Sequence, residues 1–159
     1  MKKFHSLLCL VLLLGSLLLP NKSFSQLKKY RFEQIDTLQN REKRKIIIFI
    51  HTDWCQFCQA MQNTTFKNRD LIDKLNTNFY FIDLDAEETR DISFLGRTFR
   101  FKPSGNKTGI HELATELATI NGKLAYPSLC ILNTKYEIIF QYANYLNAEE
   151  LLKILEKLK

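Results

Sequence analysis

The chain has 159 residues, of which 45% are hydrophobic and 25% are charged, with five glycines and three prolines. These values fit one globular domain with one core, and they exclude a collagen-like, low-complexity or long disordered chain. The formal net charge is +6, but residues 1–25 hold three lysines and no acid, which leaves 20 basic and 17 acidic residues in the rest. This small excess of positive charge does not predict a nucleic-acid partner.

Residues 1–25 are expected to be a secretory signal peptide. A positive start, an apolar run over residues 6–19 and small residues at Ser23 and Ser25 are the parts of such a leader. The run is short for a membrane helix, which needs about 20 apolar residues. We therefore expect cleavage after Ser25, a mature domain of residues 26–159 and a periplasmic or secreted location. Retention of the leader as a membrane tether is the alternative.

The rest of the chain alternates strand-like and helix-like segments. Continuous β-branched and aromatic runs predict buried strands, and apolar positions at helical spacing predict helices. The predicted elements, in chain order, are a helix at 30–41, a strand at 45–50, a helix from Cys55, a helix at 68–75, a strand at 79–84, a helix from Gly109, strands at 128–132 and 136–142, and a helix capped by Asn147. This order predicts an α/β domain with a central mixed β-sheet flanked by helices.

Residues 86–108 are less regular than the rest. Alternation over residues 97–102 predicts a half-exposed strand, and residues 103–106 have turn chemistry. Phenylalanine mixed with arginine and lysine also occurs on sheets that bind nucleic acids, but strand alternation explains the pattern without a ligand. His111, near the start of the next helix, is expected to be solvated.

The chemistry is expected at Cys55 and Cys58, where the strand at 45–50 meets the next helix. Two cysteines at this spacing can close a local disulfide, and the first lies among unpaired N–H groups at the positive end of the helix dipole. Those groups stabilise a thiolate, so Cys55 is expected to be the more acidic and more exposed sulfur. It would attack a substrate disulfide, and Cys58 would resolve the mixed disulfide.

Two other interpretations of this motif stay open. The cysteines could form a purely structural disulfide, or they could be half of a zinc site. Zinc needs about four ligands, and only His51, His111 and Cys130 could complete the set. Cys130 lies in the predicted strand at 128–132 and is expected to be a buried, inert thiol. No metal, nucleotide or flavin cofactor is expected, because two cysteines suffice as a redox centre.

The motif Trp54-Cys55-x-x-Cys58 after a buried strand, with Tyr126-Pro127 about 70 residues later and before another strand, resembles the thioredoxin family. The resemblance covers roughly residues 30–158. It is greatest to the secreted branch that includes the C-terminal domain of the membrane thiol:disulfide interchange reductase. It implies a thioredoxin fold, here with an insertion around residues 92–108.

The resemblance also implies which residues meet a substrate. In the family the proline is cis and packs against the CxxC, and the backbone before it pairs with the substrate, which assigns these roles to Pro127 and Tyr126. Trp54 is expected to flank the site as a partly exposed apolar contact. Gln56 and Phe57, between the cysteines, complete the expected substrate-binding set.

Two positions depart from the family pattern. Thioredoxins usually hold a buried aspartate six residues before the first cysteine, as a proton acceptor for the second, and here Phe49 stands there. The lysine that often pairs with that acid corresponds to Phe81. Another group would then have to accept the proton of the second cysteine. His51 and Asp53 are nearby candidates, although each is also typical of a surface loop.

Gln56 and Phe57 supply no cation to stabilise the Cys55 thiolate further. A less stabilised thiolate favours a reducing or intermediate potential over that of a strong oxidant. The sequence thus predicts an extracytoplasmic, monomeric thiol–disulfide oxidoreductase that acts on protein disulfides and receives electrons from a membrane donor. The alternative is a redox-inert binding module with a structural CxxC disulfide.

Overall fold

The computed structural model describes residues 26–106 and 108–158, so the expected signal peptide lies outside the described residues. The centre of the domain is a five-stranded sheet in the order β1-β3-β2-β10-β11. β2 runs parallel to β3 and antiparallel to β10, so the sheet is mixed, as predicted. Its strands are β1 (Lys29–Tyr30), β2 (Lys45–His51), β3 (Phe79–Asp85), β10 (Ser128–Leu132) and β11 (Ile138–Ala143).

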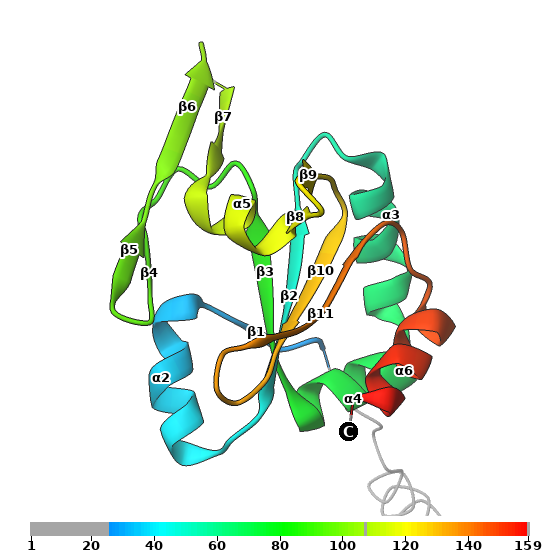
Figure 1. Cartoon of the computed structure of the whole chain (residues 1–159). Coiled ribbons are helices and arrows are strands. Elements are labelled where there is room, and N and C mark those ends of the chain that lie inside the picture. The colour runs from blue at the N-terminus through cyan, green and yellow to red at the C-terminus, as the bar shows by residue number, and fades with distance from the viewer. Residues whose placement is uncertain (1–25, 107, 159) are drawn as a thin grey trace, which may run out of the picture.

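Helices cover both faces of this sheet (Figure 1). One face, which we call the α3 face, is covered by α3 (Gln56–Asn63), α4 (Arg69–Asn78) and α6 (Ala148–Lys157), with the 3-10 turn η1 (Thr65–Lys67) between the first two. The opposite α2 face is covered by α2 (Phe32–Arg41) and α5 (Glu112–Ala118). The α/β architecture predicted from the sequence is confirmed.

The central position of β2 in the sheet explains why its sequence is apolar at successive positions. Ile47 and Phe49 point into the core of the α3 face, while Ile46, Ile48 and Ile50 point into the core of the α2 face. All five are buried, because a strand covered on both sides has no face left for water. This burial fixes the end of β2, from which the chain turns into the cysteine motif.

The insertion forms two hairpins. β4 (Ile92–Phe94) pairs with β5 (Arg97–Phe99), and β6 (Phe101–Gly105) pairs with β7 (Thr108–His111) in a hairpin that projects from the domain (Figure 1). The predicted strand at 97–102 is therefore interrupted at Arg100, whose backbone N–H donates to the Glu112 carboxylate over 2.7 Å. The basic side chains here have acidic partners, in the pairs Arg97–Glu116, Arg100–Asp91 and Lys102–Glu112.

The helix expected from Gly109 begins only at Glu112, because residues before it pair with β6. Gly109 permits this pairing, since a Cβ at that position would lie 2.4 Å from the ring of Phe101. A further small hairpin, β8 (Thr119–Ile120) with β9 (Lys123–Leu124), leads into β10.

The expectation that His111 is solvated is wrong. Its side chain is fully buried on the α2 face, where the hairpins and α5 meet. Nδ1 accepts a hydrogen bond from the Leu113 N–H over 3.2 Å, so the imidazole caps α5. Burial lowers the pKa of His111, because a charged ring is disfavoured away from water.

Candidate active site

The two cysteines lie where β2 turns into α3. Cys55 is the N-cap of α3, and its Sγ accepts a hydrogen bond from the Cys58 N–H over 3.1 Å. The two sulfurs are joined as a disulfide, with their Cα atoms 5.2 Å apart. Cys55 keeps 6% exposure and Cys58 has none. The position of Cys55 at the helix start, and its greater access to solvent, match the expectation for an attacking sulfur.

Exposed aromatic side chains surround the disulfide. Trp54 and Phe57 are 65% and 64% exposed. The Trp54 indole N–H donates to the Glu87 carboxylate over 3.1 Å, which fixes the ring although most of it contacts water. Its ring centroid lies 6.2 Å from that of Tyr126. The partly exposed position predicted for Trp54 is confirmed.

Two members of this rim were not predicted from the sequence. Glu87 follows β3 in the chain, and Tyr145 follows β11 and places its ring 6.5 Å from Phe57. Neither carries a local motif, because each reaches the site only through the order of the strands. Gln56, the first residue of α3, is exposed as expected of a residue that could meet a substrate.

The peptide bond between Tyr126 and Pro127 is cis, as the family resemblance implies. Tyr126 contacts the cores of both faces, and Pro127 is buried. The pairing of β10 with its two neighbours begins at Ser128, so Tyr126 lies outside the sheet register. The Tyr126 hydroxyl has no hydrogen-bond partner among the described residues, and burial, with the nearby carboxylates of Glu87 and Asp85, raises its pKa to about 12.

Cys130 is separated from the disulfide by the sheet. It is fully buried in the core of the α2 face, whereas Cys55 and Cys58 belong to the α3 face. Burial raises the pKa of Cys130 to about 12, which leaves the thiol protonated at neutral pH. The prediction of a buried, inert cysteine agrees with this position.

Phe49 and Phe81 occupy the positions where the family usually has an acid and a lysine. Both are buried in the cluster that contains Cys58, and Phe66 packs between them, with ring centroids 4.8 Å from Phe49 and 5.0 Å from Phe81. These two positions therefore supply neither an acid nor a base to Cys58.

Asp83, His51 and Lys29 lie together on this face. His51 Nε2 lies 2.9 Å from Asp83 Oδ1, and the Lys29 ammonium donates to Oδ2 of the same carboxylate. Burial alone would raise the pKa of Asp83, but the contacts with His51 and Lys29 outweigh it and lower that pKa below its usual value. Asp53, the other sequence candidate, is exposed. Asp83 was not singled out from the sequence.

The zinc interpretation of the motif finds no ligand set in residues 26–106 and 108–158, where no three His, Cys, Asp or Glu side chains gather closely enough to hold a metal ion. None of the helices described in these ranges has the length and apolar character to cross a membrane.

The fold has many solved relatives of low sequence identity. A thioredoxin from Thermus thermophilus is 17% identical, with a TM-score of 0.59, over 84% of this chain and 88% of that one. The DsbH oxidoreductase is 14% identical, with a TM-score of 0.58, over 85% and 88%. The C-terminal domain of DsbD from Neisseria meningitidis, in its reduced form, is 13% identical, with a TM-score of 0.53, over 80% and 92%.

No curated protein sequence matches the chain. A family model, described as a thioredoxin-like domain, matches residues 31–159, which include both cysteines and the cis proline. On this match, and with the fold described above, the chain belongs to the thioredoxin-like domain family.

Proposed function

We propose that the protein is an extracytoplasmic thiol–disulfide oxidoreductase that reduces protein disulfides. One observation carries the proposal: a Cys55–Cys58 disulfide at the N-terminus of α3, where the first sulfur reaches solvent and the second is buried. Such an arrangement lets one sulfur attack and the other resolve. The chain's membership of the thioredoxin-like family supports the same chemistry.

In the proposed reaction the protein begins as a dithiol. The Cys55 thiolate attacks one sulfur of a substrate disulfide, forms a mixed disulfide and releases the other substrate sulfur as a thiolate. Cys58 then loses its proton and attacks Cys55 Sγ, which forms the Cys55–Cys58 bond and releases the second substrate sulfur. The substrate gains two electrons and two protons, and the protein loses them.

The rim would hold the substrate beside the disulfide. Trp54, Phe57 and Tyr126 offer aromatic surface to a polypeptide, and Gln56 lies between them at the start of α3. The backbone of Tyr126 lies before the first paired residue of β10, and we propose that it pairs with an extended substrate next to Pro127.

The charges around the site favour reduction over oxidation. The Asp85 carboxylate interacts with the carboxylates of Asp53 and Glu87 beside the motif. Negative charges near a thiolate raise its energy, which destabilises the dithiol form and makes it a better electron donor. Continued turnover then needs an electron source outside the cytoplasm, for which we propose a membrane reductase. The leader at residues 1–25 would deliver the domain there.

The test compares two changes in assays of disulfide reduction, one with a protein disulfide and one with a small disulfide. Cys55→Ser should abolish turnover, because no other described thiol reaches solvent. Shortening the β6–β7 hairpin should leave turnover of a small disulfide within about twofold. If the cysteine variant keeps full activity while the shortened hairpin loses it, the protein is a redox-inert binding module. Fractionation of cells that make the chain with its own leader tests the location.

A further inference from the structure

The group formed by Lys29, Asp83 and His51 is a part of the α3 face that the reaction above does not use. Asp83 is the register partner of Phe49 across β3 and β2, so its side chain leaves the sheet on the same face. The Asp83 and His51 side chains keep only 17% and 12% exposure. Charged groups therefore lie at the border of the apolar cluster that contains Cys58.

The second step of the reaction needs a proton acceptor near this cluster. Cys58 is fully buried among apolar side chains, and a thiol in such surroundings is a weak acid, because burial disfavours its charged form. Only the thiolate attacks a disulfide. Phe49, which stands where the family usually has an acid, cannot accept the proton.

His51 is the best-placed base on this face. Its ring stacks on Phe49, with centroids 5.3 Å apart, and Phe49 shares a core cluster with Cys58. Nε2 is the ring nitrogen that faces Asp83, 2.9 Å from Oδ1, and a proton on Nε2 would leave Nδ1 able to accept another.

Other titratable groups nearby are less suited to this role. Tyr126 has its pKa raised to about 12, and a phenol holds its proton at neutral pH. Asp53 is exposed in the turn, and the Glu87 carboxylate accepts the Trp54 indole N–H. Asp85 accepts the Glu87 backbone N–H over 2.9 Å.

On the basis of the proposed function, we propose that His51, oriented by Asp83, accepts the proton of Cys58 when the mixed disulfide is resolved. The thiol proton passes to His51 Nδ1, directly or through one water molecule. The Cys58 thiolate attacks Cys55 Sγ, and the released substrate thiolate takes the proton back. Asp83 acts as a positioning residue, because its negative charge stabilises the imidazolium that forms.

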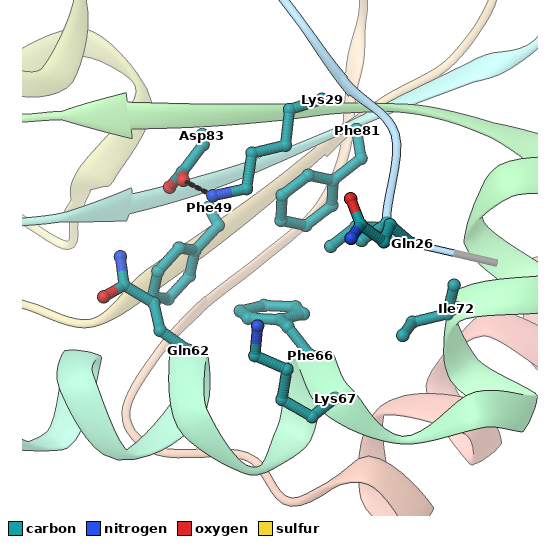
Figure 2. Close-up of a pocket in the computed structure, with 10 residues that line it drawn as sticks. Gln26, Lys29, Phe49, Gln62, Phe66, Lys67, Ile72, Phe81 and Asp83 are labelled. Carbon is teal, nitrogen blue, oxygen red and sulfur yellow. Dashed lines mark hydrogen bonds and ion pairs between the residues drawn. The ribbon is translucent and has the colours of Figure 1, made fainter. Parts of the chain in front are cut away.

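A cavity of about 560 Å³ borders Lys29 and Asp83 of this group. Figure 2 shows Asp83 and Lys29 at one side of it, the rings of Phe49, Phe66 and Phe81 around it, and polar side chains of Gln62 and Lys67 from the covering helices. The space and its polar groups suffice for water, which would let the pair exchange protons with bulk solvent between turnovers.

The charges that face His51 come from several elements. Asp83 and Asp85 interact with it from β3, Asp53 lies near Asp85, and Lys29 of β1 contacts Asp83. An imidazolium formed during resolution would therefore form an ion pair with Asp83.

Stopped-flow mixing of the reduced protein with excess dithiobis(nitrobenzoate), an aromatic disulfide, separates attack by Cys55 from resolution by Cys58. Cys55 attack releases one coloured thiolate at a rate that depends on reagent concentration, and Cys58 resolution releases a second at a rate that does not. A background of Cys9→Ser and Cys130→Ser removes the other thiols. The resolution rate is then followed as a function of pH.

His51→Gln keeps a donor toward Asp83 but removes the base. We expect it to slow resolution at pH 7 about tenfold to hundredfold and to make the rate rise steadily with pH, while the first phase stays within about twofold. His51→Asn should do the same, which guards against a folding defect in one variant. Asp83→Asn should give a smaller loss. Asp73→Asn, an exposed residue of α4 with the same charge change, is the matched control and should leave both phases within about twofold.

If both His51 variants keep the wild-type pH profile of the second phase, this inference is overturned while the proposed function stands. If the reduced wild-type protein releases no thiolate in either phase, the proposed function fails first, and this inference fails with it.

Discussion

The two faces of the sheet each hold a histidine and a cysteine, in very different surroundings. On the α3 face, Cys58 is bonded to Cys55, and His51 contacts Asp83 at the edge of a cavity. This face combines a redox bond, a charged group and access to water.

On the α2 face the same residue types are closed off. Cys130 is fully buried, with its pKa raised to about 12, and His111 is fully buried as the cap of α5. The comparison teaches that residue type alone does not predict reactivity. A cysteine at a helix start and a cavity open to solvent distinguish the α3 face from the α2 face.

Serine substitutions at one cysteine of each face, Cys58 and Cys130, should give the largest difference between the faces. Cys58→Ser should lower turnover about hundredfold or more and should trap Cys55 in a mixed disulfide with the substrate, because no resolving thiol remains. Cys130→Ser should change turnover less than twofold. Gel mobility under non-reducing conditions detects the trapped species. Equal losses in the two variants would contradict the separation of the faces.

His111 should make the stability of the domain depend on pH. Burial lowers its pKa in the folded state, so between that value and the unfolded value of about 6.5 the unfolded chain binds more protons. Stability is therefore fully present above about pH 6.5 and falls as the pH drops through that value toward the folded pKa, by up to about 1.4 kcal/mol per pH unit.

Urea unfolding between pH 7.5 and pH 5 measures this effect. The His111→Gln variant should lose this contribution to the slope, and His51→Gln should retain it. An unchanged slope in His111→Gln would mean that other groups cause the loss of stability in acid.

Substitutions in the exposed aromatic rim should have a smaller effect on activity. Trp54→Ala should lower kcat/KM for a protein disulfide about tenfold, or about 1.4 kcal/mol, because the indole is 65% exposed and fixed by Glu87. A small aromatic disulfide should react nearly as before. Leu95→Ala, which removes another exposed apolar side chain in the hairpin turn of the insertion, is the matched control and should leave both substrates unaffected. Equal losses for both substrates would argue against docking by Trp54.

Sequence patterns predicted the parts of the fold that depend on local composition. The apolar run of β2 could be recognised as a strand because both of its faces are buried. The capping box at the start of α6 could be recognised from the three-residue spacing of Asn147 and Glu150. Patterns failed where pairing is non-local. The residues from Gly109 to His111 were predicted to start a helix but pair with β6, and this pairing depends on a hairpin that local periodicity does not reveal.

The candidate site was predictable to the same extent. The cysteine motif, Trp54 and the cis proline follow from short motifs and a family resemblance. Asp83 was missed, because its importance depends on the register that places it beside Phe49 and within reach of His51. A single sequence gives no direct information on such register.

The reduction potential of the Cys55–Cys58 pair is the most direct test of the central claim. The protein is equilibrated with dithiol–disulfide buffers, and the fraction of reduced protein at each buffer ratio gives this potential. The Cys130→Ser variant is the control. A reductase should have a potential near that of thioredoxin, about −270 mV. A value near about −120 mV would make the protein an oxidant, and a pair that never exchanges would contradict a redox function altogether.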